Sequence, residues 1–122
     1  MDRQSYSFSK LCLILFSYQL DRDLKAAGKK IAVNAVNPGL MPETGLMKHG
    51  SHSSSAVLAR FANIMGTAKG SGEMITNLMC SPEFAQGPAK YYDRSSTKPV
   101  ASSKLSYDQQ AQRDLWNFSL KA

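Results

Sequence analysis

The fold of this chain is constrained most by a long apolar repeat of helical period. This repeat runs directly into a short predicted strand, and the strand stops at a Pro-Gly turn. Apolar residues recur every three or four positions over residues 5–27, which predicts an amphipathic helix with a broad buried face. This face is formed by Phe8, Leu11, Cys12, Leu15, Phe16, Leu20 and Leu24. Residues 31–36 include the β-branched Ile31, Val33 and Val36 with small residues between them, and Pro38 and Gly39 then end the predicted strand. A helix that feeds a short strand in this way favours a buried parallel sheet.

The remainder of the chain adds three more helices and one more strand to this prediction. Residues 40–55 are predicted as a loop, residues 57–65 and 70–80 as helices, and residues 89–92 as a strand. Ser106 or Asp108 caps a last helix that carries Ala111, Leu115 and Trp116, the last expected to be a packing anchor. The order helix, strand, helix, helix, strand, helix predicts an α/β fold with one parallel pair of strands. Because two strands leave an edge and much of both faces open, we expect residues 1–122 to form a single partial domain.

Composition narrows the classes of partner. The 122 residues include 15 basic and 9 acidic ones, for a formal charge of +6, but the basic residues are dispersed and no nucleic-acid recognition motif accompanies them. A solvated basic surface is therefore favoured and no nucleic-acid partner is expected. No acid lies between Glu43 and Glu73, which weakly favours an anionic ligand or contact with membrane headgroups there. Neither a secretory signal nor an apolar run of membrane-spanning length occurs, so the expected location is cytoplasmic, with an organelle left open.

The cysteines and histidines suggest no separate site. Cys12 and Cys80 sit in apolar patterns, which favours buried thiols in a reducing compartment over a single disulfide. His49 and His52 lie in a Gly/Ser-rich loop without a nearby cysteine or carboxylate, so no metal site is expected.

Tyr6 and Lys10 are the residues that could carry chemistry. Four residues apart on a helix, they project from the same face. An ammonium group favours the phenolate of a neighbouring tyrosine, and such a phenol can give a proton to a carbonyl oxygen or take it back. From the spacing alone, a solvated pair on the helix surface is the simpler interpretation.

The surroundings of this pair resemble a known family. The stretches YSFSKL (residues 6–11), VNAVNPG (residues 33–39) and TGL (residues 44–46) resemble the short-chain dehydrogenase/reductase superfamily. KYY (residues 90–92), SKLSYD (residues 103–108) and LWNFS (residues 115–119) are similar to its branch of retinol dehydrogenases and light-dependent protochlorophyllide reductases. The resemblance implies the C-terminal part of a Rossmann-like, doubly wound parallel sheet, with the N-terminal nucleotide-binding half missing.

The resemblance also implies residue roles. Tyr6 matches the proton-transferring tyrosine, and Lys10 the lysine that favours its phenolate and binds the nicotinamide ribose. Pro38, Gly39 and Leu40 match the turn against the nicotinamide ring, and Thr44 the threonine that contacts the cofactor. The cofactor would be NADP or NAD, and the substrate a small lipophilic carbonyl or alcohol compound. Residues 57–65 would either cover this substrate or form ordinary core.

Departures from the family limit these expectations. We expect no glycine-rich phosphate turn of the form Gly-x-x-x-Gly-x-Gly anywhere in the chain. The family's residue that selects between the two dinucleotides, its catalytic serine and its relay asparagine are expected to be absent as well. We therefore expect an oxidoreductase by descent, with cofactor binding and activity lacking in this chain by itself. The alternative is a non-catalytic remnant or interaction module. It would dock on a homologous subunit through the opening helix or the open strand edge.

Overall fold

The computed structural model describes residues 3–41, 65–94 and 98–121. The described elements are α1 (Arg3–Ala26), β1 (Asn34–Asn37), α3 (Ala68–Cys80), η3 (Pro82–Phe84), β2 (Lys90–Asp93), η4 (Lys104–Tyr107) and α4 (Gln109–Ser119). Their order agrees with the predicted one. The helix predicted over 57–65, Thr44 and both histidines lie outside the described residues.

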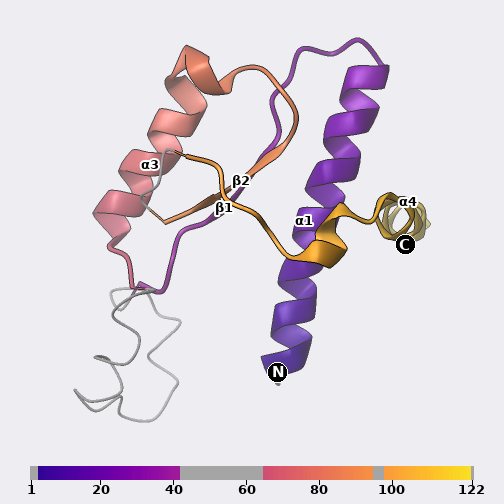
Figure 1. The fold of residues 1–122 in the computed structure, drawn as a ribbon, viewed down its shortest axis with the longest axis horizontal. Coiled ribbons are helices and arrows are strands. Elements are labelled where there is room, and N and C mark those ends of the chain that lie inside the picture. The colour runs from indigo at the N-terminus through magenta and orange to yellow at the C-terminus, as the bar shows by residue number, and fades with distance from the viewer. Residues whose placement is uncertain (1–2, 42–64, 95–97, 122) are drawn as a thin grey trace.

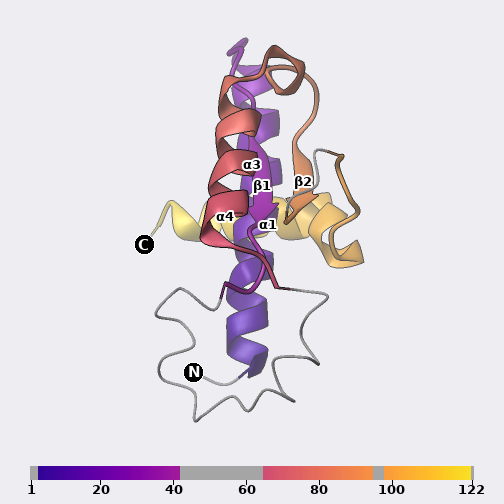
Figure 2. The same ribbon diagram turned by 90° about the vertical axis from the view of Figure 1, so that its left-hand side faces the viewer.

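The two strands form a small parallel sheet, as predicted. Asn34 lies opposite Lys90 and Asn37 opposite Asp93. Figures 1 and 2 show α1 and α3 on opposite faces of this sheet. This is an α/β arrangement consistent with part of a Rossmann-like fold. The predicted start of the first strand was wrong: pairing begins at Asn34 rather than at Ile31, whose side chain is 53% exposed, because β2 offers partners only from Lys90 onward.

The carboxyl end of α1 is tied to the start of β2. Gly28 adopts a positive φ of 69°, and the Lys29 amide donates to the Leu24 carbonyl, which is how a helix commonly ends on a glycine. Asp21 Oδ2 accepts from Lys25 Nζ at 2.6 Å and from the Ala89 amide at 3.1 Å. These hydrogen bonds fix the position at which the chain enters β2.

The core lies around the second half of α1 and the sheet. Its buried apolar side chains are Leu15, Tyr18, Met74, Phe84 and Tyr92. Phe84 and Tyr92 meet edge to face at 5.8 Å between ring centroids. Three burial predictions were wrong. Phe8 is 63% exposed because residues 4–10 of α1 are exposed throughout, Phe16 is 36% exposed, and Cys80 is exposed at the last position of α3.

The last helix is capped and anchored as the sequence indicates. Asp108 Oδ1 accepts from the amides of Gln110 at 2.8 Å and Ala111 at 3.1 Å, so Asp108, not Ser106, is the cap. Ser106 is fully buried in η4 instead. Trp116 packs against Phe16 of α1 with ring centroids 4.6 Å apart, as expected of a packing anchor.

Three further findings concern the described part of the chain. Cys12 and Cys80 are both free thiols. No cluster of potential metal ligands occurs among these residues. None of the helices in residues 3–41, 65–94 and 98–121 has the length and apolar character needed to span a bilayer.

Candidate active site

The structure brings Tyr6 and Lys10 together on one face of α1. The Lys10 Nζ lies 5.3 Å from the centroid of the Tyr6 ring, within range of a cation–π contact. The Tyr6 side chain is 44% exposed, so its hydroxyl is not sealed into the core. Among the described residues, Lys10 forms no ion pair with an acid. The pair therefore combines an accessible phenol with an adjacent ammonium group, which are the parts that proton transfer to a carbonyl oxygen requires.

The Pro38–Gly39 turn lies directly beyond β1. Gly39 has a φ of 83°, a backbone conformation that glycine adopts without strain. Its amide donates to Asn37 Oδ1 at 3.1 Å, an asparagine-centred turn that sets the direction in which the chain leaves the strand. Ligands of open α/β sheets bind beyond the carboxyl ends of the strands, which is where this turn lies.

Residues in α3 and just before it also form hydrogen bonds with the Pro38–Gly39 turn. Ser71 Oγ donates to the Pro38 carbonyl at 2.8 Å, and the Gly66 amide donates to the Leu40 carbonyl at 2.9 Å. A Cβ atom at Gly66 would lie 2.9 Å from the Pro38 carbonyl oxygen, so no larger residue fits without a shift. The sequence reasoning missed Asn37, Gly66 and Ser71 as supports. The local Asn-Pro-Gly pattern could have indicated Asn37, whereas the contact of Ser71 comes from tertiary packing.

The strand ends add a polar cluster beside the turn. Asn37 Nδ2 donates to Asp93 Oδ1 at 2.8 Å, and the Arg94 amide donates to the Asn37 carbonyl at 2.7 Å. Arg94 has a φ of 52°, which is uncommon outside glycine, and its guanidinium pairs with Asp93 at 3.1 Å. Burial, and secondarily the Asp93 carboxylate, raises the pKa of Tyr91. These contacts fix the carboxyl edge of the sheet.

The helix pair and the turn form two separate groups. Figures 1 and 2 show β1 running toward the end of the molecule at which α1 begins, so both groups lie at that end. No hydrogen bond or ring contact between described residues joins Tyr6 or Lys10 to Pro38, Gly39 or Leu40. Thr44, the remaining predicted cofactor contact, lies outside the described residues.

A glycine spacing of the phosphate-turn type does occur, contrary to the expectation that the chain has none. Gly66, Gly70 and Gly72 follow the pattern Gly-x-x-x-Gly-x-Gly at the start of α3. The Thr67 side chain caps α3 by accepting from the Gly70 amide at 3.0 Å, and Gly66 packs against Pro38. Gly70 thus takes part in a helix cap and Gly66 in a close backbone approach, after the tyrosine helix rather than before it.

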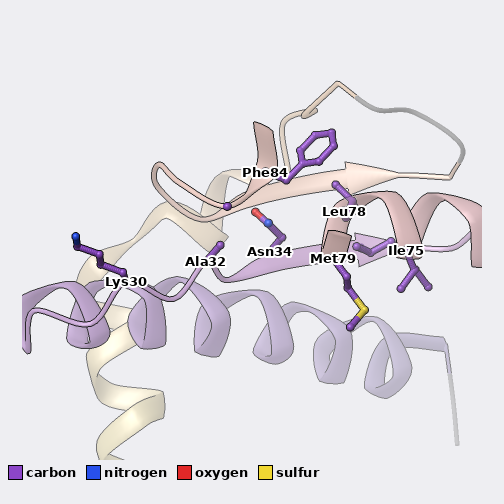
Figure 3. Close-up of a pocket in the computed structure, with 9 residues that line it drawn as sticks. Lys30, Ala32, Asn34, Ile75, Leu78, Met79 and Phe84 are labelled. Atoms are coloured by element: carbon purple, nitrogen blue, oxygen red, sulfur yellow. The ribbon is translucent and has the colours of Figure 1, made fainter. Parts of the chain in front are cut away.

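A cavity of about 480 Å³ lies between β1 and α3 (Figure 3). Its lining includes Ala32, Asn34 and Val36 from the first strand region and Ile75, Leu78 and Met79 from α3. Tyr6 and Lys10 do not line it, because α1 lies on the other face of the sheet (Figures 1 and 2). This cavity is therefore distinct from the candidate catalytic pair.

Comparisons with known proteins support the resemblance in sequence. The chain is 30% identical over 115 residues to polyprenol dehydrogenase of Danio rerio and 32% identical over 120 residues to retinol dehydrogenase 13 of Homo sapiens. It is 27% identical over 115 residues to polyprenol dehydrogenase of Homo sapiens. No protein-family model matches the chain.

These matches cover 93–94% of this chain but only 34–35% of each relative, so the chain spans about one third of their length. They agree with the resemblance to retinol dehydrogenases that the tyrosine helix, the strand and the tail carry. The chain accordingly belongs to the short-chain dehydrogenase/reductase family.

Proposed function

We propose that this chain carries the proton-transfer part of a short-chain dehydrogenase/reductase site, for hydride transfer between a nicotinamide cofactor and a carbonyl or alcohol substrate. The observation that supports this most is the contact of Lys10 with the Tyr6 ring on an accessible face of α1. The names of the relatives, which are dehydrogenases of retinol and polyprenol, suggest a lipophilic alcohol or its carbonyl product as the substrate class.

The chain's own residues would perform the proton transfer. As the carbonyl carbon accepts a hydride, its oxygen gains negative charge, and Tyr6 Oη would donate its proton to that oxygen. The alcohol forms, and the phenolate left on Tyr6 is stabilised by the Lys10 ammonium. In the direction of oxidation, the phenolate takes the proton from the alcohol.

The residues present fit one end of a nicotinamide cofactor. The Lys10 ammonium group is exposed and forms no ion pair with a described acid, so it could donate to ribose hydroxyls. The turn formed by Pro38, Gly39 and Leu40 would lie against the nicotinamide ring. NADP or NAD, once bound, would supply or accept the hydride. Thr67 already caps the helix that follows the glycine spacing, so a pyrophosphate cradle is not evident there.

Because these residues would hold only the nicotinamide end of the cofactor, we expect residues 1–122 to show no turnover by themselves. Much of the binding energy of a dinucleotide comes from its pyrophosphate. The test joins these residues to the part of human retinol dehydrogenase 13 that they do not match. Reduction of a panel of lipophilic aldehydes by NADPH and by NADH would then be followed. In that chimera, Tyr6→Phe should lower kcat by about 10²- to 10⁴-fold, with little change in KM.

Tyr107→Phe is the matched control, since Tyr107 is 52% exposed and Tyr6 is 44% exposed. It should leave kcat unchanged. Lys10→Met should both lower kcat and raise the KM for the cofactor. Full turnover in the Tyr6→Phe chimera would contradict the proposal.

A second candidate function is an interaction module without catalysis. It is favoured by the second edge of β1, which no described strand covers. A folded, cofactor-binding chimera that shows no turnover would favour this second function.

A further inference from the structure

The cavity between β1 and α3 is polar at one end and apolar at the other. Lys30 and Ala32 line one end, Asn34 lies midway, and Ile75 and Met79 of α3 line the opposite end (Figure 3). The volume of about 480 Å³ is within the usual range of small-molecule sites. This arrangement fits an elongated ligand that has a polar head and an apolar tail.

The apolar end consists of side chains that the described chain leaves partly uncovered. Ile75 is 40% exposed and Met79 is 80% exposed, whereas Phe84, which lines the cavity from η3, is only 8% exposed. Removing apolar surface from water is favourable in proportion to the area that is buried. An alkyl chain that lies against these side chains is therefore stabilised there.

The polar end carries side chains that can donate hydrogen bonds. Lys30 is exposed and forms no ion pair with a described acid, and no acidic residue of the described chain lines the cavity. Asn34 Oδ1 accepts from the Lys90 amide at 3.3 Å, so Asn34 Nδ2 is left to donate, and no described residue accepts from it. An ammonium group and an amide N–H on either side of the small Ala32 suit the two oxygens of a carboxylate.

We propose that this cavity binds a long-chain carboxylate as a free monomer. The carboxylate would lie over Ala32, between Lys30 Nζ and Asn34 Nδ2, and the alkyl chain would run along Ile75 and Met79. The cavity lies on the face of the sheet opposite to α1, so the proposal does not rest on the function proposed for the helix pair (Figures 1 and 2).

Charge favours this ligand over a second copy of the chain. Each copy carries a formal charge of +6 and would bring the same Lys30 to the contact. Like charges at one groove oppose self-pairing, whereas a monoanion is attracted to it. Self-association and contact with a lipid surface are therefore outcomes that the test must separate from binding of the monomer.

The test is a titration of the whole chain with dodecanoate below its critical micelle concentration. The chain carries ¹³C-labelled isoleucine and methionine methyl groups, and the shifts of Ile75 and Met79 are followed by NMR. Saturable shifts with one ligand per chain are expected. Hexanoate should bind at least ~10-fold more weakly, because its shorter tail buries less apolar area. Dodecanol, which has no charge, should bind at least ~3-fold more weakly.

Substitutions at exposed positions test the polar end without disturbing the core. Lys30→Met should lower the affinity for dodecanoate about 3- to 5-fold, because it removes a solvent-exposed ion pair, and Lys30→Arg should restore it. Lys29→Met is the matched control, since Lys29 is also exposed but does not line the cavity; its affinity should be unchanged. Ala32→Phe would fill the place of the carboxylate and should abolish saturation.

Several results would overturn the proposal. One is the lack of a saturable shift with monomeric dodecanoate, or shifts that occur only with vesicles of phosphatidylcholine and phosphatidylserine. Another is equal affinity for dodecanol and dodecanoate, or equal losses in Lys29→Met and Lys30→Met. A dimer of the unliganded chain whose Met79 methyl group is already buried would overturn it as well. Tyr6→Phe should bind dodecanoate as the unchanged chain does, so loss of turnover in that variant leaves this proposal unaffected.

Discussion

The two halves of α1 differ in almost every physical respect. Residues 4–10 are exposed throughout, whereas Leu15, Tyr18, Gln19 and Asp21 are at most 7% exposed. The second half packs against η4 and α4 and anchors β2 through Asp21, while the first half carries the contact between Tyr6 and Lys10, the pair proposed for proton transfer. One continuous helix thus serves as a structural element at one end and presents reactive groups at the other. Substitutions in the two halves should separate stability from activity.

Two leucines two positions apart give the largest expected contrast. Leu15 is 6% exposed and Leu13 is 59% exposed. Leu15→Ala should lower the free energy of unfolding by about 2–5 kcal/mol, because it removes buried methyl groups and leaves a cavity. Leu13→Ala should change it by less than ~0.5 kcal/mol. Urea unfolding followed by Trp116 fluorescence measures both, and equal effects would mean that the halves are not packed differently.

Asp21 and Asp23 give the next contrast. Asp21→Asn should cost about 1.5–3 kcal/mol, because it removes the buried negative charge that pairs with Lys25 Nζ and puts an amide donor at the buried position of Oδ1, where no described residue offers a hydrogen-bond partner. Asp23, which accepts from Gln19 Nε2, tolerates an amide because Asn keeps that acceptor. Asp23→Asn should therefore stay within ~0.5 kcal/mol. The same urea titrations apply; if Asp21→Asn is as mild as its control, the tie between α1 and β2 contributes little.

Tyr18 should make stability depend on pH in the alkaline range. Burial raises the pKa of Tyr18, which donates to or accepts from Ser102 Oγ at 3.1 Å. A raised pKa in the folded state favours the neutral phenol, so this contribution is complete below the unfolded value near ~10 and is lost as the pH rises further. Unfolding titrations between pH 8 and pH 11 should show that the free energy of unfolding falls less steeply with pH in Tyr18→Phe than in the unchanged chain.

Tyr107 provides the opposite sign in the same experiment. Its hydrogen bonds with Ser102 lower its pKa, so its phenolate is favoured in the folded chain and its contribution grows as the pH rises toward ~10. In Tyr107→Phe, the free energy of unfolding should therefore fall more steeply as the pH rises. A parallel change in both variants would show that the titration of other groups dominates.

The sequence predicted the parts of this molecule that depend on local pattern. The order of the described helices and strands, the parallel pairing, a cap at Ser106 or Asp108 and the position of Trp116 follow from periodicity, capping chemistry and crossover rules. The burial of Phe8 could not be predicted in the same way. An apolar stripe shows which face of a helix can be covered, whereas the number of turns that are covered depends on what packs there.

In the candidate site, too, local geometry was predictable and tertiary packing was not. Helical geometry is sufficient to place Tyr6 and Lys10 on one face, and the structure has them in contact. The supports of the Pro-Gly turn were not predictable in full, because Ser71 reaches Pro38 across 33 residues of chain through the packing of α3. The glycine spacing ahead of α3 also shows that such a pattern alone does not establish a phosphate site, since here the Thr67 cap and a close approach to Pro38 account for it.

The smallest effect on stability is expected at Tyr6, and it tests most directly whether the first half of α1 serves chemistry rather than packing. Tyr6→Phe removes one hydroxyl from an exposed side chain for which no hydrogen bond to a described residue is seen, so the free energy of unfolding should change by less than ~0.5 kcal/mol. The aromatic ring beneath Lys10 is retained, so the cation–π contact should persist. Thermal unfolding of the isolated chain measures this. A loss above 1 kcal/mol would mean that the hydroxyl has a structural partner, and any loss of turnover in the chimera would then reflect packing rather than proton transfer.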